Sequence, residues 1–186
     1  LLLDLLISKN GIIFDLDVSD KAQKILVAKG KANVDLSAPN LQESYKKATL
    51  DISVQSDGVD ISPLAAFNPE IQKIDGNLKI DISAFGTGEN PNVSGKVELE
   101  DIELDLYSLR NNVKIPHAVM DLDGIYALLQ PVIINTTNGK GYFDGRIDLR
   151  DLSYTADGRL EGLLIKSNPD DVTANLFGDI KIKGQG

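Results

Sequence analysis

The sequence contains no cysteine and a single histidine, His117. The absence of cysteine excludes disulfide frameworks, cysteine-ligated zinc, iron–sulfur clusters and thiol nucleophiles, and a lone histidine excludes multi-histidine metal sites. Basic residues are also scarce, because 19 Lys and Arg against 28 Asp and Glu give a formal net charge of −9. A nucleic-acid-binding protein needs a basic surface to displace counterions, so we exclude nucleic acid as a partner.

Long apolar segments are missing as well. The longest run without a charged residue, 124–139, contains Gln130, Pro131 and Asn135, and it is too short and too polar to span a membrane. The chain starts with Leu1 in a segment already rich in leucine, and no basic region or cleavage site of a signal peptide precedes it. We therefore expect residues 1–186 to be a single repetitive segment excised from a larger protein, with any targeting signals outside it.

Helical periodicity is nearly absent, and alternation of apolar and polar residues takes its place. Strict alternation marks strands with one buried and one wet face. It is clearest at 12–18, 49–55 and 78–83, and shorter stretches occur at 33–37, 97–99, 147–149, 160–164 and 180–182. Turn signals are found at 9–11, 56–58, 137–139 and 156–158. Because only 41–48 and 64–71 could form a turn or two of helix, the chain is predicted to be all-β.

An internal repeat suggests how the sheet is shaped. Residues 95–104 align without gaps on residues 145–154, and in both copies the apolar phase slips by one residue, at 100–101 and 150–151. A β-bulge is the simplest device that inserts one residue, keeps the same face inward and bends the strand. The repeat therefore favours a curled sheet, while a tight turn at each slip, which would end the strand, is the alternative.

The apolar face of such a sheet must be buried against something, and no helices are available to cover it. A closed β-sandwich with a dry core is the simplest solution. Two features argue against it: aromatic residues are only 5% of the chain, and glycines fall in register with the apolar positions, at Gly76, Gly95, Gly145 and Gly178. A closed sandwich and an open sheet therefore both remain possible from the pattern alone.

Residues 12–19 resemble the first motif of haloacid-dehalogenase-like phosphohydrolases, in which two aspartates, here Asp15 and Asp17, act with a magnesium ion. That motif requires a doubly wound α/β sheet and usually continues Gly-Thr, where this chain has Val18-Ser19. We therefore expect Asp15 and Asp17 on the wet face of a strand. Since nothing else assembles a nucleophile, a base and an oxyanion site, we predict that the protein is not an enzyme and binds no metal or cofactor.

The segment 69–99 carries a distinctive order of turns and strands. Gly76 opens one strand, Gly86-Thr87 closes it, and Pro91-Asn-Val-Ser-Gly95 opens the next. This order resembles the repeat of the TamB family, a large AsmA-related group in double-membraned bacteria. The segments 139–149 and 178–184 are similar to further units of the same repeat. The resemblance covers residues 69–186, while 1–60 share only the general strand pattern.

The resemblance implies a long, curled antiparallel sheet that forms an open U-shaped trough like a taco shell, in the periplasmic part of an inner-membrane-anchored protein. It implies that the trough carries phospholipid acyl chains between the inner and outer membranes. The alternative function is a chaperone or scaffold for outer-membrane barrel assembly and for protein secretion, with an outer-membrane barrel protein of the TamA or BamA type as partner.

In either case the apolar positions of the strands would line the trough. The predicted lining residues are Phe14, Leu16, Leu50, Ile52, Leu78, Ile80, Ile82, Val97, Leu99, Ile102, Leu104, Ile147, Leu149, Leu152, Leu176, Ile180 and Ile182.

Overall fold

The computed structural model describes residues 2–20, 23–107, 112–137, 139–166 and 173–185. Strands dominate it: β1 (Leu2–Ser8), β2 (Gly11–Asp20), β3 (Gln23–Asn33), β4 (Thr49–Asp60), β5 (Ile71–Thr87), β6 (Pro91–Leu106), β7 (Asn112–Gly124), β8 (Tyr126–Thr136), β9 (Gly139–Asp148), β10 (Tyr154–Lys166) and β11 (Thr173–Gly184). One α-helix, α1 (Leu41–Lys47), precedes β4, and a 3-10 helix, η1 (Ser62–Phe67), follows it.

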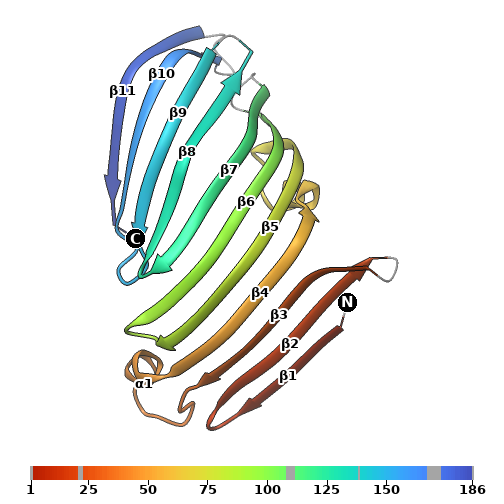
Figure 1. Ribbon diagram of the computed structural model, residues 1–186, viewed down its shortest axis with the longest axis vertical. Coiled ribbons are helices and arrows are strands. Elements are labelled where there is room, and N and C mark those ends of the chain that lie inside the picture. The colour runs from red at the N-terminus through yellow and green to blue at the C-terminus, as the bar shows by residue number, and fades with distance from the viewer. Residues whose placement is uncertain (1, 21–22, 108–111, 138, 167–172, 186) are drawn as a thin grey trace.

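The strands form a single eleven-stranded sheet in which each strand pairs antiparallel with its neighbours in the sequence (Figure 1). β1 and β11 lie at opposite edges, so the sheet is open. The predicted all-β fold with one long antiparallel sheet is confirmed, and the alternative of a closed sandwich of two sheets is wrong.

The strand register places apolar residues opposite one another across the whole sheet. Residues that face each other in an antiparallel pair share a face, so the pairs can be followed from strand to strand. One such row, from β1 to β11, consists of Leu3, Leu16, Ala28, Val54, Ile82, Gly95, Leu122, Ala127, Ile147, Tyr154 and Gly184. We call the side that holds this row the apolar face, and the other side the polar face.

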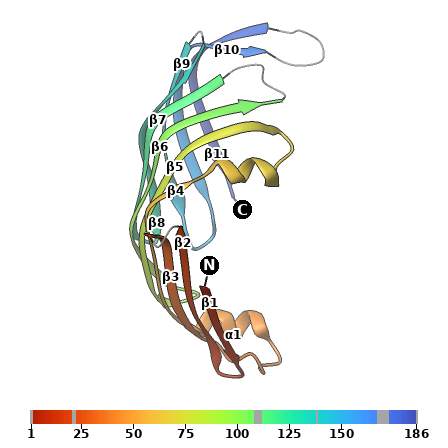
Figure 2. The same cartoon turned by 90° about the vertical axis from the view of Figure 1, so that its right-hand side faces the viewer.

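The sheet is bent into an arch, and α1 and η1 both lie on its concave side (Figure 2). Ala48 and Ile61, which are buried beside these helices, continue the apolar alternation of β4, so the concave side is the apolar face. Most of its side chains are half-buried although no second layer covers them, because the curvature brings neighbouring side chains together. Among the described residues no large side chain is completely buried, which is the opposite of a dry sandwich core.

Breaks in the register line up across the sheet and accompany this curvature. They occur at 56–59 in β4, 100–103 in β6, 129–132 in β8 and 161–163 in β10. A bulge bends its strand and increases its twist. Beyond this line the ends of β5, β6 and β7 turn toward the concave side (Figure 2).

The two copies of the internal repeat have different structures. The first copy bulges inside the continuous strand β6: Asn77 pairs with Glu100 and Asp75 with Glu103, and Asp101 has a φ of 53°. Leu99 and Ile102 both remain on the apolar face. The predicted bulge is therefore confirmed for this copy.

The second copy makes the alternative, a turn that ends β9. The Asp148 carboxylate accepts the backbone N–H of Arg150 at 3.0 Å, and the Asp151 carboxylate accepts that of Ser153 at 2.9 Å. Aspartate favours such local turns because its short side chain reaches the backbone two residues on. In the first copy the corresponding residue is Glu98 instead of an aspartate. The longer side chain of glutamate does not suit this turn. Hydrogen bonds from the Arg150 guanidinium also lower the pKa of Asp148 to about 2.

The helix predictions hold in part. α1 lies within the predicted 41–48, and Asn40 caps it by accepting the backbone N–H of Glu43 at 3.2 Å. The second prediction, 64–71, is shifted: η1 spans 62–67 with Pro63 in its first turn, and Ile71 already begins β5.

Some strand and turn predictions are wrong. Residues 34–36, within the predicted strand 33–37, lie after the end of β3 and outside any strand. The alternation did not reveal β3 itself, because Ile25, Leu26 and Val27 are consecutive apolar residues. Residues 56–58 form a bulge within β4, and 156–158 lie inside β10 with partners on both sides. The turn at 9–10 is confirmed, while Asn138 of the predicted turn 137–139 lies outside the described residues.

Candidate functional site: the apolar concave face

The strand register places the predicted lining residues together on the apolar face, apart from Leu149 and Leu152. Those two follow β9 in the turn of the second repeat copy. The Leu149 N–H donates to the Ile125 carbonyl at 2.8 Å, and Leu152 is 55% exposed with a φ of 56°. Both were predicted on the assumption that the second copy could continue as a strand, and the turn removes them from the sheet.

The register-paired, described positions of the apolar face hold no charged residue except where β2 ends, at Asp20 opposite Gln23. The other charged residues with a register partner alternate onto the polar face, as Asp81, Lys96 and Asp121 do. Asp57 and Asp101 lie in bulges and have no register partner. A predominantly apolar wall of this kind offers dispersion contacts and the release of water, but few points at which a polar ligand could be held.

Aromatic side chains on this face lie flat over glycines of the neighbouring strand. A Cβ atom on Gly30 would stand 2.4 Å from the Phe14 ring, one on Gly158 would stand 2.5 Å from the Phe143 ring, and one on Gly184 would stand 2.4 Å from the Tyr154 ring. Each glycine is the register partner of its aromatic residue. These pairs let large rings contribute apolar area without standing far out of the face.

Further residues of the apolar face were missed at the sequence level. β7 adds Met120 and Leu122, and β8 adds Leu129, Val132 and Ile134. In β8 the alternation is visible on either side of Pro131, but the bulge there shifts the phase of the alternation. Allowing a one-residue slip at each proline would have revealed them.

The polar face is held together by ion pairs and hydrogen bonds between neighbouring strands. Lys79 contacts Glu100 at 2.7 Å, the Gln130 amide donates to Asp121 at 2.6 Å, and the Arg146 guanidinium lies 3.4 Å from the centre of the Tyr126 ring. Such exposed pairs each contribute little to stability. Together they give the convex side a charged, hydrated character that contrasts with the concave side.

The aspartates of the phosphohydrolase-like motif lie on this polar face, as predicted. Asp15 pairs in register with Asp4 and Lys29, and its carboxylate lies 3.1 Å from the Lys29 ammonium. Asp17 accepts a hydrogen bond from the Ser19 hydroxyl at 2.8 Å. The α/β sheet that the motif requires is replaced by an antiparallel one, so these residues are part of a hydrated strand surface.

Glu98, Glu100 and His117 also meet on the polar face, with their candidate ligand atoms within 4.8 Å of one another. The ammonium group of Lys79 already pairs with the Glu100 carboxylate, and that of Lys96 pairs with the Glu98 carboxylate. These ion pairs account for the cluster without a metal ion. Sequence spacing alone did not reveal it, because the β6–β7 register brings His117 opposite Glu100.

No helix in the described part of the chain is long and apolar enough to cross a membrane. Comparison with known proteins found no matching family model, no matching curated protein and no matching solved structure. The resemblance to the TamB repeat therefore rests on the turn and strand order of residues 69–186, and the functional argument rests on the geometry of the apolar face.

Proposed function

We propose that this chain is a segment of a periplasmic bridge whose apolar trough carries phospholipid acyl chains between the inner and outer membranes of a double-membraned bacterium. The observation that supports this proposal most strongly is the apolar row that crosses all eleven strands on an uncovered concave face. A folded protein rarely leaves so large an apolar surface uncovered unless something binds to it.

The dimensions of the trough suit acyl chains. Eleven strands spaced ~4.8 Å apart span about 48 Å across the sheet, against ~15 Å for the hydrocarbon of one leaflet. Burial of each CH₂ group stabilises the complex by about 0.8 kcal/mol. Because the wall is predominantly apolar and almost free of charge along its length, that free energy is similar at successive positions, which favours movement along the trough.

A vesicle assay tests the proposal. Donor vesicles of phosphatidylethanolamine and phosphatidylglycerol carry a fluorescent phospholipid, and unlabelled acceptor vesicles are added with or without the protein. We expect the protein to accelerate transfer at least tenfold over the spontaneous rate. Transfer at the spontaneous rate, by protein that retains its β circular dichroism spectrum, would contradict the proposal.

The edge strand β1 supports the second candidate, a scaffold for outer-membrane barrel assembly and secretion. It is apolar on both faces: Leu3 and Leu5 lie on the apolar face, and Leu2 and Leu6, each 62% exposed, lie on the polar face. An exposed apolar edge is a template for pairing with another strand. A strand of a barrel protein of the TamA or BamA type would be its partner. Deletion of β1 would then abolish barrel-protein binding and leave lipid transfer intact.

A further inference from the structure

The sheet is split between β3 and β4. Their register pairs run from Asn33 opposite Thr49 to Val27 opposite Gln55. Beyond this point β3 continues with β2 alone, and β4 continues with β5 alone. Figure 1 shows the two strands diverging toward the end of β4.

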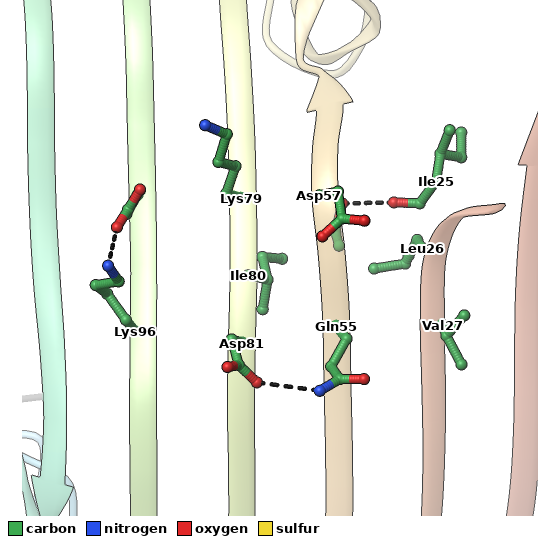
Figure 3. A pocket seen from close by; sticks show the side chains of 11 residues that line it. Ile25, Leu26, Val27, Gln55, Asp57, Lys79, Ile80, Asp81 and Lys96 are labelled. Carbon is green, nitrogen blue, oxygen red and sulfur yellow. Dashed lines mark hydrogen bonds and ion pairs between the residues drawn. The ribbon is translucent and has the colours of Figure 1, made fainter. Parts of the chain in front are cut away.

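A hollow of about 600 Å³ lies at this split (Figure 3). This volume is within the range of about 300–1,000 Å³ that is typical of small-molecule sites. Both faces of the sheet contribute to its lining: Leu26, Ser56 and Ile80 belong to the apolar face, and Val27 and Gln55 to the polar face. Residues of both faces therefore border the hollow at the split.

The β3 side of the split is aliphatic, which distinguishes it from the rest of the convex side, while β4 contributes the polar residues Gln55, Ser56 and Asp57. Val27 lies in the same register row as Asp81 and Lys96, yet it is aliphatic. Ile25, two residues earlier in β3, lines the hollow too. Leu26 and, from β5, Ile80 add further aliphatic side chains to the lining. Its outer margin bears charges of both signs, from Asp57, Lys79, Asp81, Lys96 and Glu98.

A serine hydroxyl bridges the split. Ser56 is 9% exposed, its hydroxyl donates to the Ile25 carbonyl at 2.5 Å, and it accepts the Gly58 N–H at 3.2 Å. A hydroxyl contact of this kind is weaker than a ladder of backbone hydrogen bonds. The split can therefore widen at less cost than a paired part of the sheet.

We propose that the split between β3 and β4 is a side opening of the trough and that it binds one acyl chain of an amphiphilic lipid, with the polar head at the charged outer margin. This inference rests on the proposed function, since the chain it admits is one that the trough would carry. The volume of the hollow, the aliphatic side chains that β3 contributes and the residues of both faces at its border support this occupant.

Paired cysteines test the opening, because the natural chain contains none. Leu26→Cys with Ser56→Cys places thiols on the apolar face just beyond the last register pair, so that a disulfide closes the split. Lys31→Cys with Asp51→Cys is the matched control, since these residues pair within the intact ladder on the polar face, away from the trough. Mass spectrometry verifies each disulfide, and circular dichroism verifies the fold.

Two readouts are compared in the oxidised and reduced forms: binding of cis-parinaric acid, followed by its fluorescence, and transfer of the fluorescent phospholipid. We expect oxidation of the Leu26/Ser56 pair to reduce both at least fivefold, with recovery on reduction, and oxidation of the control pair to change neither by more than twofold. Equal binding in both forms of the Leu26/Ser56 pair, or equal losses in the control, would overturn the side opening.

The two proposals can fail separately. Disulfide-sensitive binding of cis-parinaric acid without phospholipid transfer would support the opening and contradict the conduit. Transfer that is insensitive to the Leu26/Ser56 disulfide would support the conduit and overturn the opening.

If the double variant does not fold, a second pair of variants tests the opening. Val27→Lys places a charge in the hollow, and Ser53→Lys, on the same face, places a charge outside it. Equal parinaric acid binding by these two variants would likewise overturn the opening.

Discussion

Protein carrying Ile147→Arg is expected to remain folded and to lose at least nine-tenths of its bound phospholipid. Ile147 lies on the apolar face between Ala127 of β8 and Tyr154 of β10, and it is only half-buried. In an uncovered trough the arginine head can reach water, so the expected destabilisation is about 1–2 kcal/mol, from the lost apolar contacts alone. The charge would nevertheless stand in the path of an acyl chain.

The matched control is Asp144→Arg, on the same strand but on the polar face opposite Asp157. It should change neither stability nor lipid content. Asp148 also lies on the polar face, but its bonds to Arg150 make it unsuitable as a silent position. Unfolding of the Ile147→Arg protein, at a cost of several kcal/mol, would contradict an apolar face that water can reach.

Gly95→Ala is expected to have the largest effect on stability, about 3–5 kcal/mol, because it combines backbone strain with a direct clash. Gly95 has a φ of 123°, and a Cβ atom there would lie 1.9 Å from the backbone oxygen of Asp81 on β5. The neighbouring strand cannot give way without breaking its register. Urea denaturation, followed by circular dichroism, measures the change.

Gly178→Ala separates strain from clash. Gly178 has a similar φ of 127°, but an added Cβ would meet nothing within 4 Å. Its expected cost is therefore the strain alone, about 1–2 kcal/mol. Equal destabilisation by the two substitutions would show that the close approach of β5 and β6 at Gly95 is not what requires glycine there.

The strand pattern of this chain was predictable wherever alternation was uninterrupted. Residues 12–18, 49–55 and 78–83 became parts of β2, β4 and β5, and their apolar residues other than Ile13 lie on one face. β3 and β8 were not predictable in this way. In β3 three apolar residues follow one another at the split, and in β8 the bulge at Pro131 reverses the phase.

Turn signals were misleading where a glycine served a contact between strands. Asp157-Gly158 reads as a turn, yet Gly158 lies inside β10 because the Phe143 ring of β9 occupies the space of a side chain there. The repeat at 100–101 and 150–151 shows a similar limit. Its copies share a phase slip, and the choice between bulge and turn depended on an aspartate at position 148 where the first copy has Glu98.

The candidate site was predictable as a set of residues but not as a shape. Period two assigns side chains to a face, and this assignment held for the predicted residues within strands, from Phe14 in β2 to Ile182 in β11. Whether that face closes on a second sheet or stays open depends on the curvature of the whole sheet. The curvature follows from bulges that line up across strands, which a single segment of sequence does not reveal.

Organic-solvent extraction of the purified protein, followed by mass spectrometry of the extract, tests most directly whether the apolar face holds acyl chains. The protein is purified without detergent, and an equal amount of the Ile147→Arg protein is treated in parallel. We predict at least one phospholipid per wild-type chain and less than a tenth of that in the variant. Wild-type protein that is folded and free of phospholipid, also after incubation with phospholipid vesicles, would contradict the account.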